Sequence, residues 1–175
     1  MKVCIICAQG QEESEALLTY DLLYRAGLEV DLLGLDDEIT SSHKVTFKTN
    51  KLLKSTNIDE YDCLVLPGGM PGTINLENSK LVQDAIDLFN LKNKLIAAVC
   101  AAPSILIHKG LLNDNEFTCY PGFESGKIST NLKAMKTRNI ITGIGLGGVI
   151  EFSSLIISSL LNEETAKKVI DKIKY

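Results

Sequence analysis

The chain has 175 residues, of which 45% are hydrophobic and 23% are charged, and its formal net charge is −4. This length and apolar fraction are those of one globular domain with its own core, and they exclude a mainly disordered chain. The small negative charge argues against binding to nucleic acid or to an anionic membrane, which requires clustered lysine and arginine. We therefore expect a single domain over residues 1–175 and no nucleic-acid-binding patch.

Neither a membrane segment nor a signal peptide is indicated. The longest apolar stretch, residues 95–107, contains Pro103 and Ser104 and is too short to span a bilayer. The first residues lack the pattern of a signal peptide. The five cysteines are an odd number in a chain large enough to fold without disulfides, which favours a reducing compartment. The expected location is the cytoplasm.

Short apolar runs typical of buried strands alternate with amphipathic stretches typical of helices. Gly27 and Gly110 stand where the predicted helices over residues 13–26 and 101–109 should end. Asn78 and Ser79 are available to cap the predicted helix over residues 80–89. Residues 39–48 break the rhythm and suggest a small antiparallel hairpin. The predicted strands are residues 2–7, 28–35, 62–66, 95–99 and 139–142, and the predicted helices are residues 13–26, 80–89, 101–109, 148–161 and 165–174.

Strands rich in valine, isoleucine and leucine, separated by helices, indicate a parallel sheet covered on both faces. The predicted fold is a flavodoxin-like α/β three-layer sandwich of the class I glutamine amidotransferase-like type. In such folds the functional site lies at the carboxyl ends of the strands. The segments expected there are residues 8–15, 66–72, 99–103 and 142–148.

Cys100 directly follows a predicted strand and precedes a predicted helix. A residue at such a turn projects into the site, as a nucleophile does in an elbow. The start of a helix behind the thiol is expected to favour thiolate. The simpler interpretation is that Cys100 is a buried packing residue, which is the common role of a free cysteine; its position favours the nucleophile.

Two other features belong to the same edge. The run from Pro67 to Gly72 (PGGMPG) follows a strand, and its glycine amides suit an oxyanion hole, although an ordinary turn would look the same. Glu12, Glu13 and Glu15 stand at the start of the first helix, where acids favour the helix dipole. One of them, placed near Cys100, would have a raised pKa and could act as a proton donor. Spacing alone does not say which one.

The remaining thiols and both imidazoles lack a motif that implies chemistry. Cys4 and Cys7 lie three apart on a strand and so face opposite sides, which argues against a disulfide or a metal pair. Cys63 is expected in the core, and a packing role is preferred for Cys119 over that of a resolving cysteine. His43 and His108 are expected to be structural or surface residues. The sequence predicts no metal site and no cofactor.

Taken in order, these features resemble the DJ-1/ThiJ/PfpI superfamily, and specifically its DJ-1/ThiJ (protein deglycase-like) branch. The resemblance runs essentially from end to end. It rests on AQGQEESEALL near the start, on YDCLVLPGGMPG and AAVCAAP in the middle, and on TCYPGFE and GLGGVIEF late in the chain. It implies a flavodoxin-like fold, a homodimer and a site without a cofactor.

By position, the resemblance implies that Cys100 is the nucleophile, that Glu15 is the site carboxyl, and that Gly69 and Ala101 supply oxyanion-hole amides. Gly68 and Tyr120 are expected to border the pocket. Two departures stand out. Tyr120 occupies a place where many relatives have histidine, and Ile144 to Gly147 (IGLG) replaces the branch's frequent Arg-Gly-Pro-Gly.

Three functions use these residues. The first is a cofactor-independent Cys–Glu enzyme acting on 2-oxoaldehydes, converting methylglyoxal to lactate or removing early glycation adducts. The second is a redox-sensing stress protein or chaperone in which Cys100 is oxidised. The third, a cysteine peptidase or amidase, is disfavoured because Tyr120 stands where an imidazole is needed.

Overall fold

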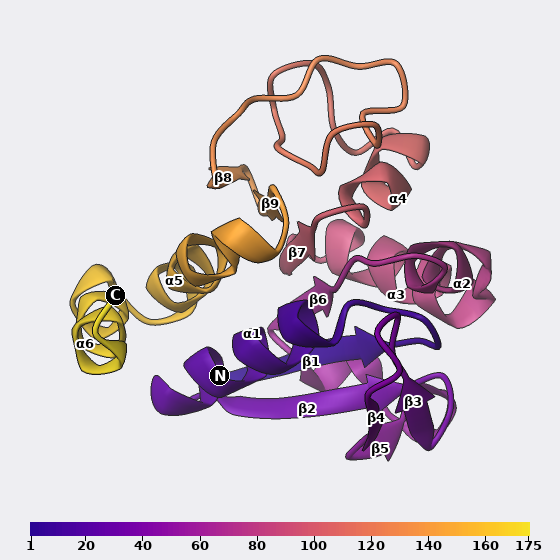
Figure 1. Cartoon of the computed structure of the whole chain (residues 1–175), viewed down its shortest axis with the longest axis horizontal. Helices are drawn as coiled ribbons and strands as arrows, with labels where there is room; N and C mark the ends of the chain where they lie inside the picture. The colour runs from indigo at the N-terminus through magenta and orange to yellow at the C-terminus, as the bar shows by residue number, and fades with distance from the viewer.

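A computed structural model describes all residues, 1–175, and its centre is a seven-stranded sheet (Figure 1). The strands are β1 (Lys2–Cys7), β2 (Glu29–Gly34), β3 (Glu38–Thr40), β4 (Thr46–Lys48), β5 (Lys51–Leu52), β6 (Cys63–Leu66), β7 (Leu95–Val99), β8 (Ala134–Thr137) and β9 (Ile140–Gly143). The sheet order is β5-β2-β1-β6-β7-β9-β8, and only the β8–β9 pair is antiparallel. Strands β3 and β4 form the expected separate antiparallel hairpin.

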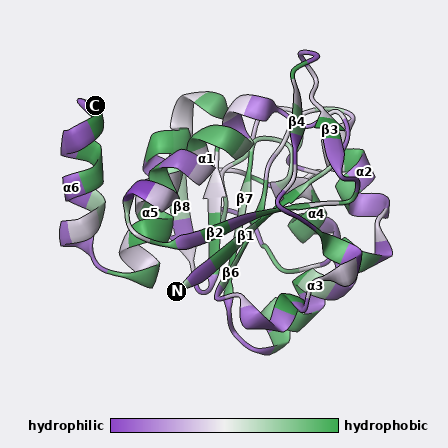
Figure 2. Ribbon diagram, turned by 90° about the horizontal axis from the view of Figure 1, so that it is seen from below, coloured by the Kyte–Doolittle hydropathy of each residue, from purple (hydrophilic) through white to green (hydrophobic).

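Helices cover both faces of this sheet, as predicted for a flavodoxin-like three-layer sandwich. One face packs against α1, α5 and α6, and the other against α2, α3 and α4. Helix α6 packs on α5 and lies outermost in the molecule (Figure 2). The helices are α1 (Glu13–Arg25), α2 (Gly72–Asn78), α3 (Lys80–Leu91), α4 (Pro103–His108), α5 (Val149–Leu160) and α6 (Glu163–Ile173), with short 3₁₀ turns at Leu53–Ser55, Ile58–Glu60 and Leu146–Gly148.

Alternation along β1 divides its side chains between the two hydrophobic cores. Cys4 belongs to the core under α2, α3 and α4, whereas Cys7 belongs to the core under α1, α5 and α6. The two thiols therefore face opposite sides of the sheet, as strand geometry requires. Cys63 is completely buried on the Cys7 side, which confirms the expectation of a core residue.

Several predicted boundaries are wrong by a few residues, with identifiable causes. Helix α6 begins at Glu163 rather than Thr165, because the Asn162 side chain accepts a hydrogen bond from the Thr165 N–H and caps the helix. Helix α4 begins at Pro103 rather than Ala101, because residues 101 and 102 form a turn after the strand. The Ser79 side chain makes no capping hydrogen bond to α3.

Helix α2 and strand β8 were absent from the prediction. Helix α2 starts at the last glycine of the PGGMPG run, where a Cβ on Gly72 would lie 2.4 Å from Gln11 Cα. The helix is therefore set by close packing against the segment after β1, which periodicity does not record. Strand β8 is only four residues long and half-buried at the sheet edge, so it lacks a buried strand's apolar pattern.

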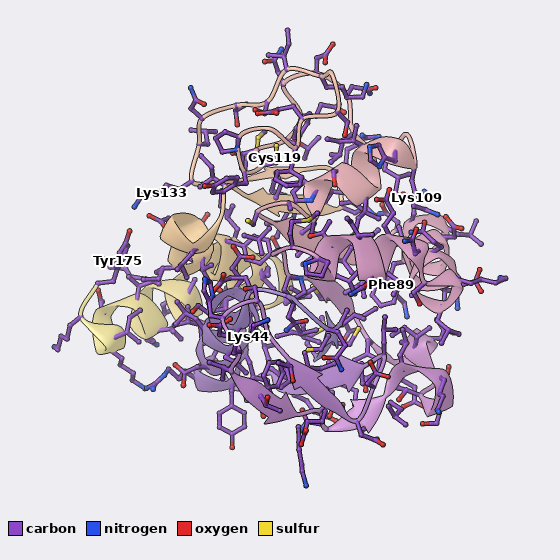
Figure 3. All side chains as sticks on the ribbon, turned by 45° about the vertical axis from the view of Figure 1, so that its right-hand side comes forward. Lys44, Phe89, Lys109, Cys119, Lys133 and Tyr175 are labelled. Atoms are coloured by element: carbon purple, nitrogen blue, oxygen red, sulfur yellow. The ribbon has the colours of Figure 1, made fainter.

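Residues 111–133 connect α4 to β8 without a regular helix or strand and arch over one end of the sheet (Figure 1). The segment is fastened by buried Thr118, whose Oγ1 donates a hydrogen bond to the carbonyl of Leu132 at 2.7 Å or to that of Thr130 at 3.1 Å. The Thr118 N–H in turn donates to Thr142 Oγ1 on β9. The next residue, Cys119, lies at the base of this arch (Figure 3).

No helix combines the length and apolar character needed to cross a bilayer.

Replacing Thr118 with valine tests this fastening. The change keeps the side-chain shape but leaves buried carbonyl groups without their donor, so the free energy of unfolding should fall by about 1–3 kcal/mol. Urea denaturation monitored by circular dichroism measures this value. Thr46→Val, on the exposed hairpin strand β4, is the matched control and should change stability little. Equal stability of Thr118→Val and the wild type would contradict the assigned role.

Candidate active site

The site lies where β6 and β7 end, with Cys100 at its centre. Cys100 has a backbone φ of 64°, in the left-handed region, between β7 and the turn before α4. This is the sharp turn expected of a nucleophile elbow, and side chains other than glycine adopt it at an energetic cost. Its N–H donates to the Gly143 carbonyl at 2.9 Å, and its carbonyl accepts from the Tyr120 N–H at 2.8 Å. The thiol's direction is thereby fixed by two neighbouring segments.

Gly68 lies directly against this turn. A Cβ on Gly68 would come 2.5 Å from Cys100 Cβ and 2.9 Å from the Ala101 nitrogen. Real Cβ atoms do not approach so closely, so only glycine allows the end of β6 to pack against the cysteine turn. Gly68, which the resemblance placed at the pocket border, thus allows the ends of β6 and β7 to lie close together.

The backbone of Gly68 also holds the start of α1. Its carbonyl accepts from the Glu12 N–H at 2.9 Å, and its N–H donates to Glu15 Oε2 at 2.9 Å. Glu15 is 1% exposed, and its carboxyl lies close enough to the Cys100 thiol for each group to shift the pKa of the other. Of the three glutamates at the start of α1, Glu15 is therefore the one that faces Cys100.

Burial raises the pKa of Glu15 to about 7, and the Glu12 carboxylate adds to the increase. The N–H groups of Gly68 and Leu146 and the Cys100 thiol oppose it. Burial also raises the pKa of Cys100 to about 12, with Glu15 as the second cause. The pair therefore carries two protons below pH 7 and shares one above it.

The expectation that the start of a helix would favour thiolate is wrong while Glu15 is ionised. The N–H groups of Gly69 and Ala101 do lower the pKa of Cys100, but burial and the adjacent carboxylate outweigh them. A thiolate at Cys100 is instead coupled to protonation of Glu15. Gly69 and Ala101 thus both direct a backbone donor toward the sulfur, which is the geometry from which an oxyanion hole can be built.

Tyr120 and the segment after β9 form the other side of the site. A Cβ on Gly145 would lie 3.4 Å from Tyr120 Cδ2 and 3.9 Å from Cys100 Sγ. The Tyr120 ring also meets Phe123 edge-on, with ring centroids 6.4 Å apart. Leu146 lies next to Glu15 through its backbone N–H. The sequence marked Leu146 as part of a departure from the branch but did not predict this contact.

The other cysteines and both histidines lie in different surroundings. Cys119 is 2% exposed, and burial raises the pKa of its thiol to about 11, in keeping with the preferred packing role. His108 bridges Glu77 on α2, at 2.5 Å, and Ser125 in the arch, at 2.8 Å. This histidine ties the arch to the helices rather than serving Cys100.

His43 lies beside two of the glutamates at the start of α1. It pairs with Glu12 at 3.4 Å and with Glu13 at 3.2 Å. These are the residues of the chain that could hold a metal ion, because their ligand atoms lie within 4.8 Å of one another. The sequence did not indicate this cluster, since His43 is brought to α1 by the hairpin fold.

No enclosed cavity surrounds Cys100. The largest cavity, of about 500 Å³, lies at the opposite end of the strands and is lined by residues such as Met1, Asp62 and Asn139. Cys100 itself is half-buried, whereas the other four cysteines are buried. The site is thus open, which suits a small electrophile or an adduct carried on a larger molecule.

The raised pKa of Glu15 predicts how stability depends on pH. The group has its ordinary pKa near 4.5 when unfolded and about 7 when folded, so the folded protein holds the proton more tightly. As the pH rises from 4.5 to 7.5, the free energy of unfolding should fall by about 3 kcal/mol relative to that of Glu15→Gln. Urea denaturation across this range measures it. Glu163→Gln, at the exposed start of α6, should keep the wild-type slope, and parallel curves for wild type and Glu15→Gln would refute the assignment.

Comparisons with known proteins identify the family of the chain. The family model for the DJ-1/PfpI family matches residues 1–159. Protein dj-1beta of Drosophila melanogaster is 31% identical over 94% of this chain and 92% of its own length. A protein named as a deglycase in Pyrococcus horikoshii is 32% identical over 82% of this chain and 86% of its own length. The chain spans only 40% of protein DJ-1 homolog B of Arabidopsis thaliana, at 31% identity.

Solved structures show the same fold. The structure titled "Toxoplasma gondii DJ-1, oxidized" matches with a TM-score of 0.94 and 32% identity, covering 99% of this chain and 98% of that one. Drosophila melanogaster DJ-1beta matches with a TM-score of 0.92 and 30% identity, covering 98% and 96%. The chain belongs to the DJ-1/PfpI family, in its DJ-1/ThiJ branch.

Proposed function

We propose that the chain is a cofactor-independent enzyme that converts reactive 2-oxoaldehydes to 2-hydroxy acids, as in methylglyoxal to lactate, without glutathione. The observation that carries the proposal is the buried Glu15 carboxyl beside the Cys100 thiol, held there by the Gly68 N–H, with the Gly69 and Ala101 amides next to the sulfur. The named deglycase among the relatives supports the same reaction class, including removal of early glycation adducts.

The first step is attack of the Cys100 sulfur on the aldehyde carbon. A C–S bond forms, the carbonyl π bond breaks, and the thiol proton passes to Glu15. The amides of Gly69 and Ala101 stabilise the oxygen that becomes negative. Return of the proton to this oxygen gives a hemithioacetal. A carboxyl with a pKa of about 7 suits both transfers, since it gains and loses a proton easily near neutral pH.

The second step moves a proton between the two substrate carbons. Ionised Glu15 removes the proton from the former aldehyde carbon, which gives an enediolate. The hydroxyl proton of this intermediate passes to the neighbouring oxygen, and Glu15 returns its proton to the neighbouring carbon. The product is a thioester of the 2-hydroxy acid on Cys100. Water cleaves the C–S bond, which releases the acid and regenerates the thiol. No external oxidant or reductant is consumed, because one carbon is oxidised as the other is reduced.

Lactate formation from methylglyoxal tests the proposal. Cys100→Ser should abolish measurable turnover, and Glu15→Gln should lower kcat/KM by about 10²–10⁴-fold, because the proton shuttle is lost. The kcat/KM of the wild type should rise with pH to a plateau, with its midpoint near 7. Cys119→Ser is the matched control and should retain activity. Full activity in Cys100→Ser or Glu15→Gln would rule out the proposed mechanism.

A second candidate function is redox sensing at the same thiol. The observation that favours it is that Cys100 is half-exposed while Cys4, Cys7, Cys63 and Cys119 are buried. Two equivalents of peroxide would convert Cys100 to sulfinate with release of water, and protonated Glu15 could donate a hydrogen bond to the new oxygen.

Mass spectrometry after mild peroxide treatment distinguishes the candidates. A dedicated sensor should accumulate two oxygen atoms on Cys100 while the buried cysteines stay reduced, because access governs oxidation. Cys100→Ala should then take up no oxygen at cysteine. Oxidation spread evenly over all five cysteines would count against a sensor.

A cysteine peptidase or amidase is the weakest candidate, because His43 and His108 are both engaged elsewhere. The proposal also includes a homodimer and a cytoplasmic location. Five free thiols without a disulfide suit a reducing compartment.

A further inference from the structure

Three exposed apolar residues lie on separate segments whose backbones border Cys100 and Glu15. Met70 follows Gly69 at the end of β6 and is 43% exposed. Tyr120 arrives with the arch and is 53% exposed, and Leu146 follows β9 and is 51% exposed. We call Met70, Tyr120 and Leu146 the apolar rim.

The backbone of each rim residue or its neighbour contacts the reacting groups. The Gly69 N–H, next to Met70, points to the Cys100 sulfur, and the Tyr120 N–H donates to the Cys100 carbonyl. The Leu146 N–H points to the Glu15 carboxyl. The rim is therefore fixed with respect to the nucleophile.

Carboxyl groups gather on the α1 side of the rim. Glu12 and Glu13 lie on the α1 side, with His43 between them, and Glu15 lies inside. An anionic substrate would meet like charges here. A neutral substrate with an apolar group would instead cover exposed apolar surface when the sulfur reaches its carbonyl.

We infer that the apolar rim selects neutral carbonyl compounds carrying an apolar or aryl substituent over small unsubstituted ones and over anionic ones. This inference rests on the proposed function for the aldehyde itself. In terms of that reaction, kcat/KM should rise from glyoxal to methylglyoxal to phenylglyoxal. A phosphorylated or carboxylated carbonyl compound should be a poor substrate.

A test independent of turnover uses alkylation of Cys100. Sulfur displaces iodide from iodoacetamide, iodoacetate or N-benzyl iodoacetamide, with loss of the thiol proton to Glu15 or water. These reagents compare a neutral, an anionic and an apolar electrophile. Rates at Cys100 are measured by mass spectrometry and divided by those of glutathione, which removes intrinsic reactivity.

The benzyl reagent should exceed iodoacetamide by about 10-fold in normalised rate, and iodoacetate should fall below it by a similar factor. Leu146→Asn and Met70→Gln should reduce the benzyl preference by at least about threefold each. Leu91→Asn is the matched control, because Leu91 is 83% exposed at the end of α3 and should leave the preference unchanged.

Equal normalised rates, or a preference that the rim variants do not alter, would overturn the inference. So would a change of oligomeric state in Leu146→Asn, seen by light scattering, with the preference unchanged, because the rim would then be a subunit contact. Parallel assays with the three aldehydes separate the two proposals. Alkylation preference without lactate or mandelate formation refutes only the proposed reaction, whereas turnover without discrimination refutes only the rim.

Discussion

The close approach of Gly68 to Cys100 is the constraint on which the site depends. Because a Cβ at residue 68 would come within 2.5 Å of Cys100 Cβ, the end of β6 can pack against the cysteine turn only through glycine. The same residue binds the first turn of α1 through both its N–H and its carbonyl. One side-chain-free residue thus joins the acid, the thiol and two strand ends. The rest of the sheet holds this junction in place.

The consequence of that packing is a buried acid beside a half-buried thiol. Neither group loses its proton easily in this position, because burial raises both pKa values. The pair nevertheless loses its first proton near pH 7. The Glu15 carboxyl and the Cys100 sulfur share the proton that remains. Both carbonyl chemistry and oxidation of Cys100 draw on this arrangement, which explains why the sequence could not choose between them. The surrounding apolar and acidic side chains bear on substrate choice instead.

Most of the fold was predictable because its signals are local. The buried strands β1, β6 and β7 are nearly continuous apolar runs, and the helices between them show clear periodicity. Helix α2 was missed because close contact of Gly72 with Gln11 defines it, and β8 because it is a short edge strand. Local patterns do not record such contacts.

The site was predictable in part for the same reason. The position of Cys100 after a strand and before a helix pointed to the elbow, which its φ of 64° bears out. The choice of Glu15 over its neighbours came from the family resemblance, since spacing left three glutamates open. The raised pKa of Cys100 and the contact of His43 with Glu12 depend on burial and on long-range packing. No sequence pattern reports either.

The central claim, that Glu15 loses its proton near pH 7 beside the Cys100 thiol, can be measured directly. Carbon-13 NMR of the Glu15 side-chain carboxyl gives its titration curve in wild type and in Cys100→Ala. We predict a midpoint near 7 in the wild type. The midpoint should move upward in Cys100→Ala, because the neighbouring thiol lowers the pKa of Glu15. A wild-type midpoint near 4.5, or a downward shift in the variant, would contradict the account.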